Sequence, residues 1–448
     1  MNSAPLNSRT MIFMSSLLYA VALSYCLSSY ASVEWASYGY SFKQLNAVDV
    51  ACLLCVLGIW ATRVPKAIIA PSSLILVVTY AVVCIPSLVV ALGLNRDHQY
   101  YYYTLIVFLT FSFLICCQLV SLFSQATPVI SRKHSQLFVP SVLVGWTICF
   151  ALLIGTYRGT MSFVSLDNLY AQREIGAATS LFMGYVQTYY GYVFSPVLLV
   201  IGLTERRLLL VVAGIVGGLL LYSITAEKTV FLLPGLIILG HYFLSRDTIF
   251  FRSTAMLTGM LGAVVAASVF WYEQSAVAAF MAWYLGVRTL LTPGLFVSQY
   301  LDFFGETGYT FLSHVSGIGS IVPRPAVYQS ESRWPSIGHI VGEQYVGFPD
   351  LNANASFLAS DGIASFGVPG VLFAFLLLAV FLIVLDRAAR GIDNIFCVLV
   401  LLPVAFLLTN GSLFTVSLSF GGGFWILAFY LFFSRQMTPV SKPLAGSH

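Results

Sequence analysis

The sequence predicts an all-α protein that crosses a membrane many times. Of its 448 residues, 59% are hydrophobic and only 8% are charged, and the mean hydropathy is +0.89. Soluble proteins carry roughly 25% charged residues, so water is not the solvent for most of this chain. Apolar runs of about twenty residues recur along it, which is the length that a helix needs to cross a hydrocarbon core about 30 Å thick.

We expect about twelve membrane-spanning helices, with both ends of the chain on the cytoplasmic side. The expected spans lie near 11–31, 46–62, 67–93, 101–124, 137–156, 181–202, 207–223, 229–245, 253–271, 367–386, 395–413 and 416–434. Short cytoplasmic loops are enriched in Lys and Arg, and this arrangement places 13 of the 21 basic residues on that side, against 4 of the 17 acidic residues. The 13 basic residues are Arg9, Arg63, Lys66, Arg132, Lys133, Arg206, Arg207, Arg246, Arg252, Arg387, Arg390, Arg435 and Lys442. Because each inner loop holds at least two of them, the charge distribution supports the number of spans.

Two long segments, about 157–180 and 272–366, then lie on the outer side. Within the second, the apolar stretch 275–287 is short for a span, so we expect an interfacial or re-entrant helix there. The chain accordingly divides into nine spans (1–271), a large outer loop (272–366), and three further spans with a cytoplasmic tail (367–448).

The sequence lacks the common motifs of nucleotide and metal chemistry. It contains no P-loop, no Gly-rich dinucleotide fingerprint, no His-Glu-x-x-His and no Asp-x-Asp. The centres of the expected spans carry almost no charge, whereas a proton- or ion-coupled transporter places ionisable groups there at a cost of roughly 2.5–3.5 kcal/mol each. We therefore expect no cofactor, no metal site and no nucleic-acid partner, and we expect the functional site on the outer side, where the polar residues gather.

Four outer arginines are candidates for binding phosphate groups. Arg158 and Arg173 lie in the first outer loop, and Arg288 and Arg333 lie in the second. A guanidinium group binds phosphate oxygens through a planar fork of donors and stays charged at any working pH. The alternative for each single arginine is a contact with solvent or with lipid headgroups.

Another outer cation, Lys228, lies at a span junction beside Glu227. A local ion pair between these two neighbours is the alternative to a functional role for the lysine.

Several outer side chains are candidates for a general base. His339 has an ordinary pKa near 6.5 and is suited to accept a proton from a hydroxyl group. Glu343 and Asp302 offer carboxylates for the same role, and His314 and His98 are weaker candidates.

The segment 351–370, LNANASFLASDGIASFGVPG, joins the large outer loop to the tenth span. Asn352, Asn354 and Asp361 have short side chains that bond to nearby backbone and favour caps and turns. Gly362 and Gly367 allow unusual backbone angles or close approach of two chains. We therefore expect a tight, polar, re-entrant turn at the start of the tenth span.

This segment resembles the Asn-x-Asn…Asp-Gly…Phe-Gly-x-x-Gly signature of Wzy-type oligosaccharide repeat-unit polymerases. Arg288-x-x-x-x-Pro293, the aromatic cluster that begins at Tyr300, and the lysine of AEKT, Lys228, are similar to further features of that family. Arg173, followed by ten residues and Gly184, also matches an Arg-Gly spacing of these polymerases. The resemblance covers about 220–370, and the rest of the chain is similar only in its architecture.

The resemblance implies a GT-C class glycosyltransferase of the bacterial inner membrane whose active site faces the periplasm. Such an enzyme moves a glycan, without a metal, from undecaprenyl diphosphate to the non-reducing end of another lipid-linked repeat unit. The expected partners are the lipid-linked oligosaccharide, membrane lipid, a chain-length regulator and a flippase. The residues expected to bind the diphosphate and glycan are Arg158, Arg173, Lys228, Arg333, Tyr300, Asn352, Asn354 and Asp361, and those expected to be catalytic are Arg288, His339 and Glu343.

Two alternatives stay open. An O-antigen ligase uses the same donor but transfers the glycan to the lipid A core. A flippase or other polysaccharide transporter is disfavoured by the long outer loop and by the span centres, which are almost free of charge.

Overall fold

The computed structural model describes residues 8–95, 99–124, 132–163, 169–177, 179–246, 253–348 and 351–435. These residues are almost entirely helical, with one short antiparallel pair of strands, β1 (Arg132–His134) and β2 (Phe433–Arg435). Nine helices of the described residues are long and apolar enough to cross a membrane: Ser8–Glu34, Pro71–Gly93, Tyr101–Ser124, Phe138–Tyr157, Leu181–Thr204, Leu208–Thr225, Ala276–Thr307, Val368–Ala389 and Leu413–Phe432. The predicted class, an all-α polytopic membrane protein, agrees with this architecture.

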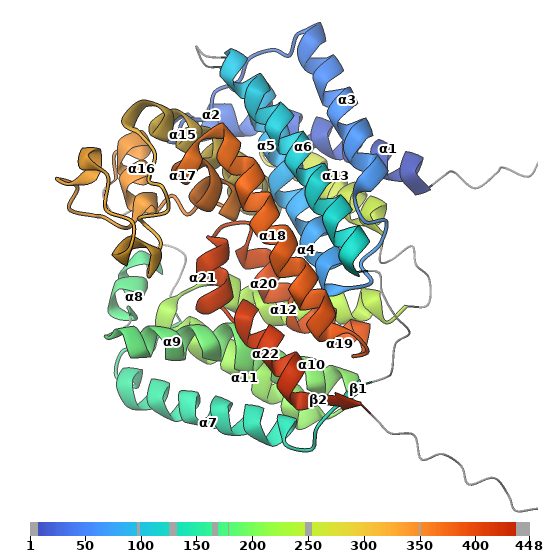
Figure 1. Ribbon diagram of the computed structural model, residues 1–448, viewed down its shortest axis with the longest axis vertical. Coiled ribbons are helices and arrows are strands. Elements are labelled where there is room, and N and C mark those ends of the chain that lie inside the picture. The colour runs from blue at the N-terminus through green and yellow to red at the C-terminus, as the bar shows by residue number, and fades with distance from the viewer. Residues whose placement is uncertain are drawn as a thin grey trace, which may run out of the picture.

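The helices form two groups in Figure 1. The upper group contains α1 (Ser8–Cys26), α3 (Ala47–Arg63), α4 (Pro71–Thr79), α5 (Ile85–Gly93), α6 (Gln99–Ser124), α13 (Thr254–Phe270) and α18 (Val368–Ala389). The lower group contains α7 (Phe138–Tyr157), α9 (Leu181–Tyr189), α10 (Ser195–Thr204), α11 (Leu208–Thr225) and α22 (Gly422–Phe432). Two short helices, α20 (Leu402–Leu407) and α21 (Leu413–Leu418), lie between the groups.

Helices that are distant in the sequence pack together in the upper group. α13 lies along α1 because Gly262 has no side chain: a Cβ there would come within 3.0 Å of the Tyr19 Cα. Ser15 Oγ and Thr258 Oγ1, 2.8 Å apart, form a hydrogen bond across the same contact. α18 packs against α6 in a similar way, so the last third of the chain completes a group that the first third begins.

The structure differs from the predicted spans in their lengths and in two breaks, one of which separates α21 from α22 inside the span predicted at 416–434. The segments predicted at 46–62, 229–245 and 253–271 form helices of 17 residues each, Ala47–Arg63, Lys228–Leu244 (α12) and Thr254–Phe270. The predicted span 395–413 is wrong as a single helix, because it is divided into α19 (Asn394–Val400) and α20. A turn at Leu401 separates the two helices just before Pro403, which has no N–H to continue the helix.

The predicted short helix at 275–287 is also wrong in its extent. α14 (Ala276–Met281), the π-helical segment η7 (Ala282–Leu291) and α15 (Thr292–Thr307) form one helix of 32 residues. The helix passes Pro293 because the turn before it is widened: the Thr292 hydroxyl donates to the Val287 carbonyl over 2.9 Å, five residues back.

Each end of this helix lies beside another helix. Its first residue follows the end of α13 after a short turn. Near its other end, Tyr102 at the start of α6 donates to Asp302 over 2.7 Å, and both the end of α13 and the start of α6 are predicted on the outer side.

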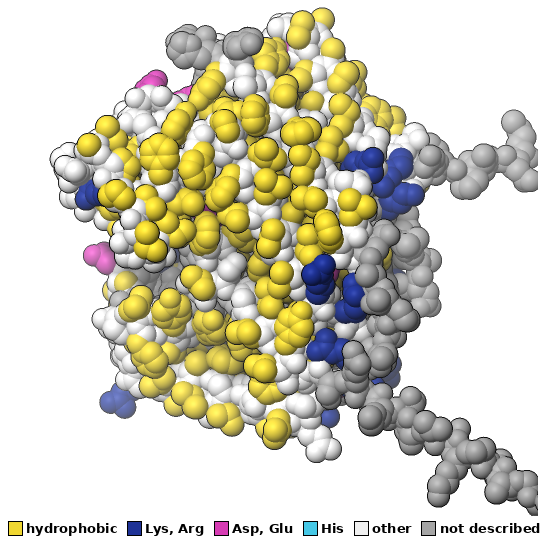
Figure 2. All heavy atoms as spheres, in the orientation of Figure 1, with side chains coloured by type: hydrophobic (Ala, Val, Ile, Leu, Met, Phe, Trp, Pro, Cys, Tyr) yellow, Lys and Arg dark blue, Asp and Glu magenta, His cyan; other side chains and the backbone are white. Residues whose placement is uncertain are grey.

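Basic side chains gather at one edge of the molecule, beside the two strands, while hydrophobic side chains cover most of the face in Figure 2. We call this edge the basic end. Exposed apolar side chains on the helices include Val107, Val380 and Leu431, as expected for helices that face lipid.

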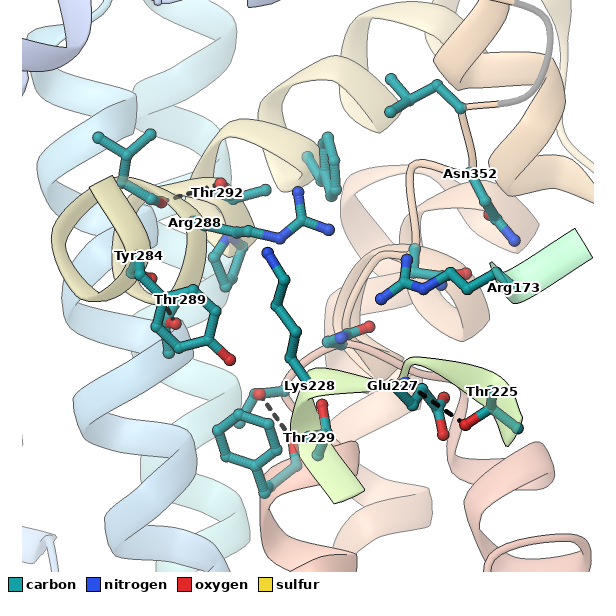
Figure 3. Close-up of a pocket in the computed structure, with 18 of the residues that line it drawn as sticks. Arg173, Thr225, Glu227, Lys228, Thr229, Tyr284, Arg288, Thr289, Thr292 and Asn352 are labelled. Carbon is teal, nitrogen blue, oxygen red and sulfur yellow. Dashed lines mark hydrogen bonds between the residues drawn. The ribbon is translucent and has the colours of Figure 1, made fainter. Parts of the chain in front are cut away.

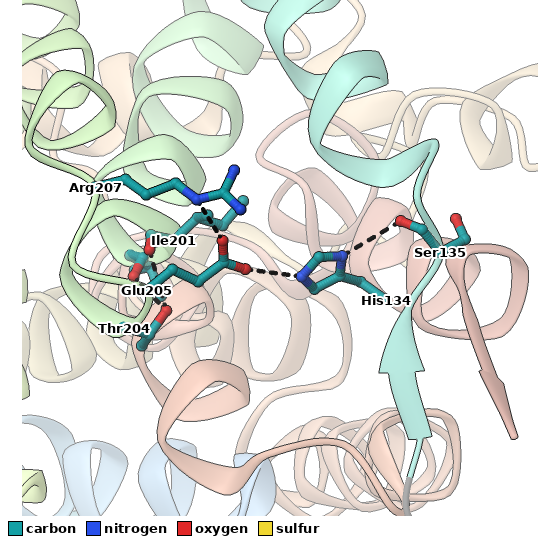
Figure 4. Close-up of polar contacts among 7 residues, drawn as sticks. His134, Ser135, Ile201, Thr204, Glu205 and Arg207 are labelled. Carbon is teal, nitrogen blue, oxygen red and sulfur yellow. Dashed lines mark hydrogen bonds and ion pairs between the residues drawn. The ribbon is translucent and has the colours of Figure 1, made fainter. Parts of the chain in front are cut away.

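An ion pair and a histidine–carboxylate contact hold the connections at the basic end. His134 Nε2 of β1 lies 2.8 Å from Glu205 Oε1, and Arg207 Nε lies 3.0 Å from Glu205 Oε2 (Figure 4). These contacts join β1 to the turn between α10 and α11.

The opposite end, which we call the loop end, carries the small helical elements. They are η1 (Leu27–Ala31), α2 (Ser32–Glu34), η2 (Ala36–Tyr38), α8 (Leu169–Ile175), η8 (Ile318–Ser320), η9 (Ala326–Tyr328) and α16 (Ile337–Val346). Two further π-helical segments, η3 (Tyr80–Cys84) and η5 (Tyr190–Phe194), interrupt the helices that approach this end.

The tight turn predicted at 351–370 is present. It forms the buried π-helical segment η10 (Leu358–Ile363) and α17 (Ala364–Phe366), and Gly367 turns the chain into α18 with φ +66°. Gly362 and Gly370 approach each other so closely that a Cβ on Gly362 would lie 2.6 Å from the Gly370 carbonyl oxygen. Glycine is therefore required at this contact.

The Gly362–Gly370 contact predicts a large effect of one methyl group. Gly362→Ala should destabilise the purified protein by about 1–3 kcal/mol, because the added Cβ pushes η10 away from α18. Thermal unfolding in detergent, followed by size-exclusion chromatography, measures the loss. Gly155→Ala is the control, since a Cβ at Gly155 on α7 meets nothing within 4 Å, and an unfolding temperature lowered equally by both changes would contradict the prediction.

Candidate functional site

A cavity of about 570 Å³ lies between the two groups of helices, at the ends of α11 and η7 and the start of α12 (Figure 3). Further lining comes from α8, from η2 and from the segment that starts at Leu351. Five of the residues predicted to bind or act on substrate meet here although they are far apart in the sequence: Arg173, Lys228, Arg288, Asn352 and Asn354.

Three cationic side chains converge on this cavity from three elements. Arg173 comes from α8, Lys228 is the first residue of α12, and Arg288 comes from η7; Figure 3 shows them pointing into the same space. Burial and the charges of Arg288 and Arg173 all oppose the charge of Lys228. A positive side chain at a helix N-terminus is also unfavourable, because that end of the helix carries a positive partial charge. The three positive side chains together offer hydrogen-bond donors of the kind that bind an anion.

Arg173 is held in place by the residues around it. Gln172 Nε2 donates to the carbonyl oxygens of Thr160, Ser223 and Ile224, which fixes α8 against the end of α11. Gly176 lies so close to the same end that a Cβ would come within 1.9 Å of the Ile224 carbonyl oxygen.

Lys228 and Arg288 are positioned by a turn and by a widened helix. Ala226, with φ +50°, turns the chain between α11 and α12, and the Lys228 ammonium lies 4.6 Å from the ring centre of Trp283 and 5.7 Å from that of Tyr284. The π-helical turn that carries Arg288 is stabilised by the Thr289 hydroxyl, which donates to the Tyr284 carbonyl over 2.7 Å. π-helical turns of this kind occur frequently at functional sites.

Glu227 also lines the cavity, and the sequence interpretation had treated it only as a partner for Lys228. Its Oε2 accepts a hydrogen bond of 3.1 Å from the Tyr192 hydroxyl. Burial raises the pKa of Glu227 above its ordinary value, although the Tyr192 bond and the nearby Arg173 act against this. Glu227 and Lys228 point in different directions in Figure 3, so the alternative of a local ion pair between them is not supported.

The asparagines are presented by a segment that two other elements hold. The buried Tyr300 hydroxyl donates to the Ala353 carbonyl over 3.0 Å, and the Ala353 N–H donates to the Gly338 carbonyl of α16 over 2.9 Å. Because the backbone of Ala353 is fixed from both sides, the exposed side chains of Asn352 and Asn354 line the cavity.

An aromatic wall completes the cavity and was not predicted. Trp35 and Trp283 stack at 6.1 Å with an angle of 27° between their planes, and Tyr38, Tyr40 and Tyr284 lie beside them in the lining. The run WASYGY between the first two spans is the signal in the sequence that indicates such a wall.

The remaining predicted site residues lie elsewhere. Arg158 is exposed at the end of α7. On and beside α16, Arg333 pairs with Glu343 at 3.5 Å, and His339 Nδ1 lies 2.7 Å from the Ser336 hydroxyl. None of these residues lines the cavity.

The other base candidates have local partners. Asp302 accepts from Tyr102, as described above. His314 is half-buried, its Nδ1 lies 2.8 Å from the Thr310 hydroxyl, and loss of solvent around the ring lowers its pKa to about 4. His98 lies outside the described residues.

Two predicted ligand-binding residues instead support the structure. Tyr300 holds Ala353, as described above. Asp361 is fully buried, and its Oδ2 accepts from the Leu413 N–H over 2.6 Å, which ties η10 to the start of α21. Burial raises the pKa of Asp361 to about 6, although hydrogen bonds from Ser412, the Leu413 N–H and Ser360 act against this.

The raised pKa of Asp361 predicts how stability changes with pH. Between about pH 4 and pH 6 the unfolded chain ionises this carboxyl while the folded protein keeps it protonated, so Asp361 makes the protein less stable as pH rises through that window. Asp361→Asn removes this loss, which is at most about 3 kcal/mol at 1.36 kcal/mol for each pKa unit. Unfolding temperatures of both proteins from pH 4.5 to 7.5 check the prediction, and a stability difference that does not change with pH would contradict it.

A comparison with known proteins found no protein family, no curated protein and no solved structure that matches this chain.

Proposed function

We propose that this protein is a membrane-embedded glycosyltransferase that polymerises oligosaccharide repeat units carried on undecaprenyl diphosphate. The proposed location is the bacterial inner membrane, with the cavity open to the periplasm. The observation that carries the proposal is the convergence of Arg173, Lys228 and Arg288 on one cavity, with Glu227 as the one carboxylate among its described lining residues.

The charge of the cavity suits a diphosphate. Three cations against one carboxylate leave an excess of two positive charges, and like charges a few ångströms apart near a protein surface repel by about 4 kcal/mol per pair. A lipid diphosphate offers two phosphate groups for two guanidinium forks and one ammonium group. The N-terminus of α12, which begins at Lys228, adds favourable backbone dipoles for an anion.

The rest of the lining suits the other two parts of a lipid-linked glycan. The aromatic wall and the amides of Asn352 and Asn354 offer stacking faces and hydrogen bonds to sugar rings. Leu221, Phe406 and Phe420 offer an apolar surface for the first isoprene units.

In the proposed reaction, a hydroxyl group of the acceptor glycan attacks the anomeric carbon of the donor glycan. The bond between this carbon and the diphosphate oxygen breaks, and the diphosphate leaves with the electron pair. Arg288, Lys228 and Arg173 stabilise the negative charge that develops on the leaving group. The product is a longer glycan on the acceptor lipid and free undecaprenyl diphosphate.

A reconstituted reaction tests this function. Lipid-linked repeat units are extracted from a strain that lacks the gene and are incubated with the purified protein in liposomes. We expect a ladder of products that differ by one repeat unit. In cells, loss of a polymerase leaves single repeats on the lipid A core, loss of a ligase leaves bare core, and loss of a transporter leaves lipid-linked repeats on the cytoplasmic side; either of the last two results would contradict the proposal.

Arg288 provides a test of the leaving-group site. Arg288→Ala should lower the polymerisation rate by about 10²–10³-fold, as removal of a single preorganised donor does in other enzymes. Arg288→Lys should have an intermediate effect, because it keeps the charge but loses the fork. Arg207→Ala is the control, since Arg207 pairs with Glu205 at the basic end and is 59% exposed; equal rates for Arg288→Ala and the control would remove Arg288 from the site.

Lys228 provides a test that needs no glycan. Lys228→Met should weaken the binding of undecaprenyl diphosphate by about 10–100-fold, the effect of one lost hydrogen bond to a charged group. The shift in unfolding temperature with increasing ligand gives the affinity, and undecaprenyl monophosphate is the comparison ligand. A ligand affinity that is the same in wild type and variant would contradict the role of Lys228.

A further inference from the structure

The proposed reaction requires a group that accepts the proton of the acceptor hydroxyl, and the two bases predicted from the sequence lie outside the cavity. His339 bonds to Ser336, and Glu343 pairs with Arg333. Glu227, by contrast, reaches the cavity from the turn that also carries Lys228 (Figure 3).

One oxygen of the Glu227 carboxylate is oriented by a hydrogen bond, and the other has no hydrogen bond from the part of the chain that the structure describes. As the N-cap residue of α12, Glu227 has its backbone fixed by the turn at Ala226, while its side chain forms no cap hydrogen bond. The Tyr192 hydroxyl of η5 donates to Oε2 and holds the carboxylate in one orientation. Tyr192 is itself almost fully buried and packs edge-on against Phe420 at 5.1 Å, so this orientation is rigid.

We propose that Glu227 is the catalytic base, a role that rests on the glycosyl transfer proposed above. As the acceptor oxygen bonds to the anomeric carbon of the donor, its proton moves to the Glu227 carboxylate. The carbon–oxygen bond to the diphosphate breaks at the same time, and the diphosphate leaves with that electron pair. Glu227 then releases the proton to water, and the site is restored.

The groups that face Glu227 fit this role. Tyr192 from η5 and Arg173 from α8 favour the ionised carboxylate, and burial opposes it. Lys228, the next residue, adds a further positive charge at the start of α12. A general base works best when its pKa lies near the working pH. A carboxyl group with a raised pKa is therefore a better base near neutral pH than a carboxyl group with its ordinary, lower pKa. The reaction should slow as pH falls through the pKa of Glu227, because only the ionised form accepts a proton.

Three variants separate a base from a structural role, with all rates measured on the full-length protein in liposomes. Glu227→Gln should bind the lipid-linked repeat as wild type does but should turn over about 10²–10⁴-fold more slowly, the usual contribution of a general base. Tyr192→Phe should move the acidic limb of the pH–rate profile to higher pH, because it removes a hydrogen bond to the ionised form. Glu306→Gln, at an exposed carboxylate near the end of α15, is the matched control and should leave rate and profile unchanged.

Azide tests the chemistry directly. Azide attacks the anomeric carbon without losing a proton, so Glu227→Ala with added azide should release undecaprenyl diphosphate and form a glycosyl azide at a restored rate. Three results would each overturn Glu227 as the base while the polymerase function stands. The first is a wild-type rate in Glu227→Gln, and the second is a loss of substrate binding in that variant that matches its loss of rate. The third is an absence of azide rescue in Glu227→Ala. An absence of any product ladder from the wild-type protein would instead overturn the proposed function, and the assignment of the base with it.

Discussion

The positive charges of Arg173, Lys228 and Arg288 repel one another, and the rest of the site has to hold these side chains together against that repulsion. One carboxylate among the described lining residues, Glu227, attracts Arg173, but this single charge does not offset the repulsion among three cations. Neutral contacts hold the cations in place: the amide of Gln172 against three carbonyl groups, the rings of Trp283 and Tyr284 beside the lysine, and the hydroxyls that support the π-helical turn under Arg288. The net positive charge of the cavity supports the proposed binding of an anion.

Keeping three like charges close together requires helices that do not move apart. Close packing of helices at glycine residues supplies this rigidity. Gly176 brings α8 onto the end of α11, and the Gly362–Gly370 contact brings η10 onto α18. Asp361 extends the second contact to α21 through a buried hydrogen bond. Such contacts tolerate little movement because interiors are packed as densely as crystals, and they hold both sides of a cavity that lies between two groups of helices.

The π-helical turns of η5 and η7 orient two side chains of the site. η5 carries Tyr192 and η7 carries Arg288, and in each the π-helical turn changes the direction in which side chains leave the helix. A regular helix repeats every 3.6 residues, whereas one wider turn rotates all the residues that follow. The 32-residue helix that contains η7 thus buries α15 against α5 and still directs Arg288 into the cavity.

The sequence by itself determined the helical class, the position of most membrane helices, the tight turn at 351–370, and five of the polar residues that meet in the cavity. These follow from local rules: apolar run length, the placement of basic residues, and the turn preferences of Asn, Asp and Gly. Only the tertiary structure decided which polar residues share a site. Arg173, Lys228 and Arg288 converge because helices far apart in the sequence pack together, while Arg158, Arg333, His339 and Glu343 have the same chemical character but lie on other surfaces. The sequence suggested an ion pair between Glu227 and Lys228 because the two residues are adjacent. The direction in which each side chain points after the turn depends on packing, which the sequence does not reveal.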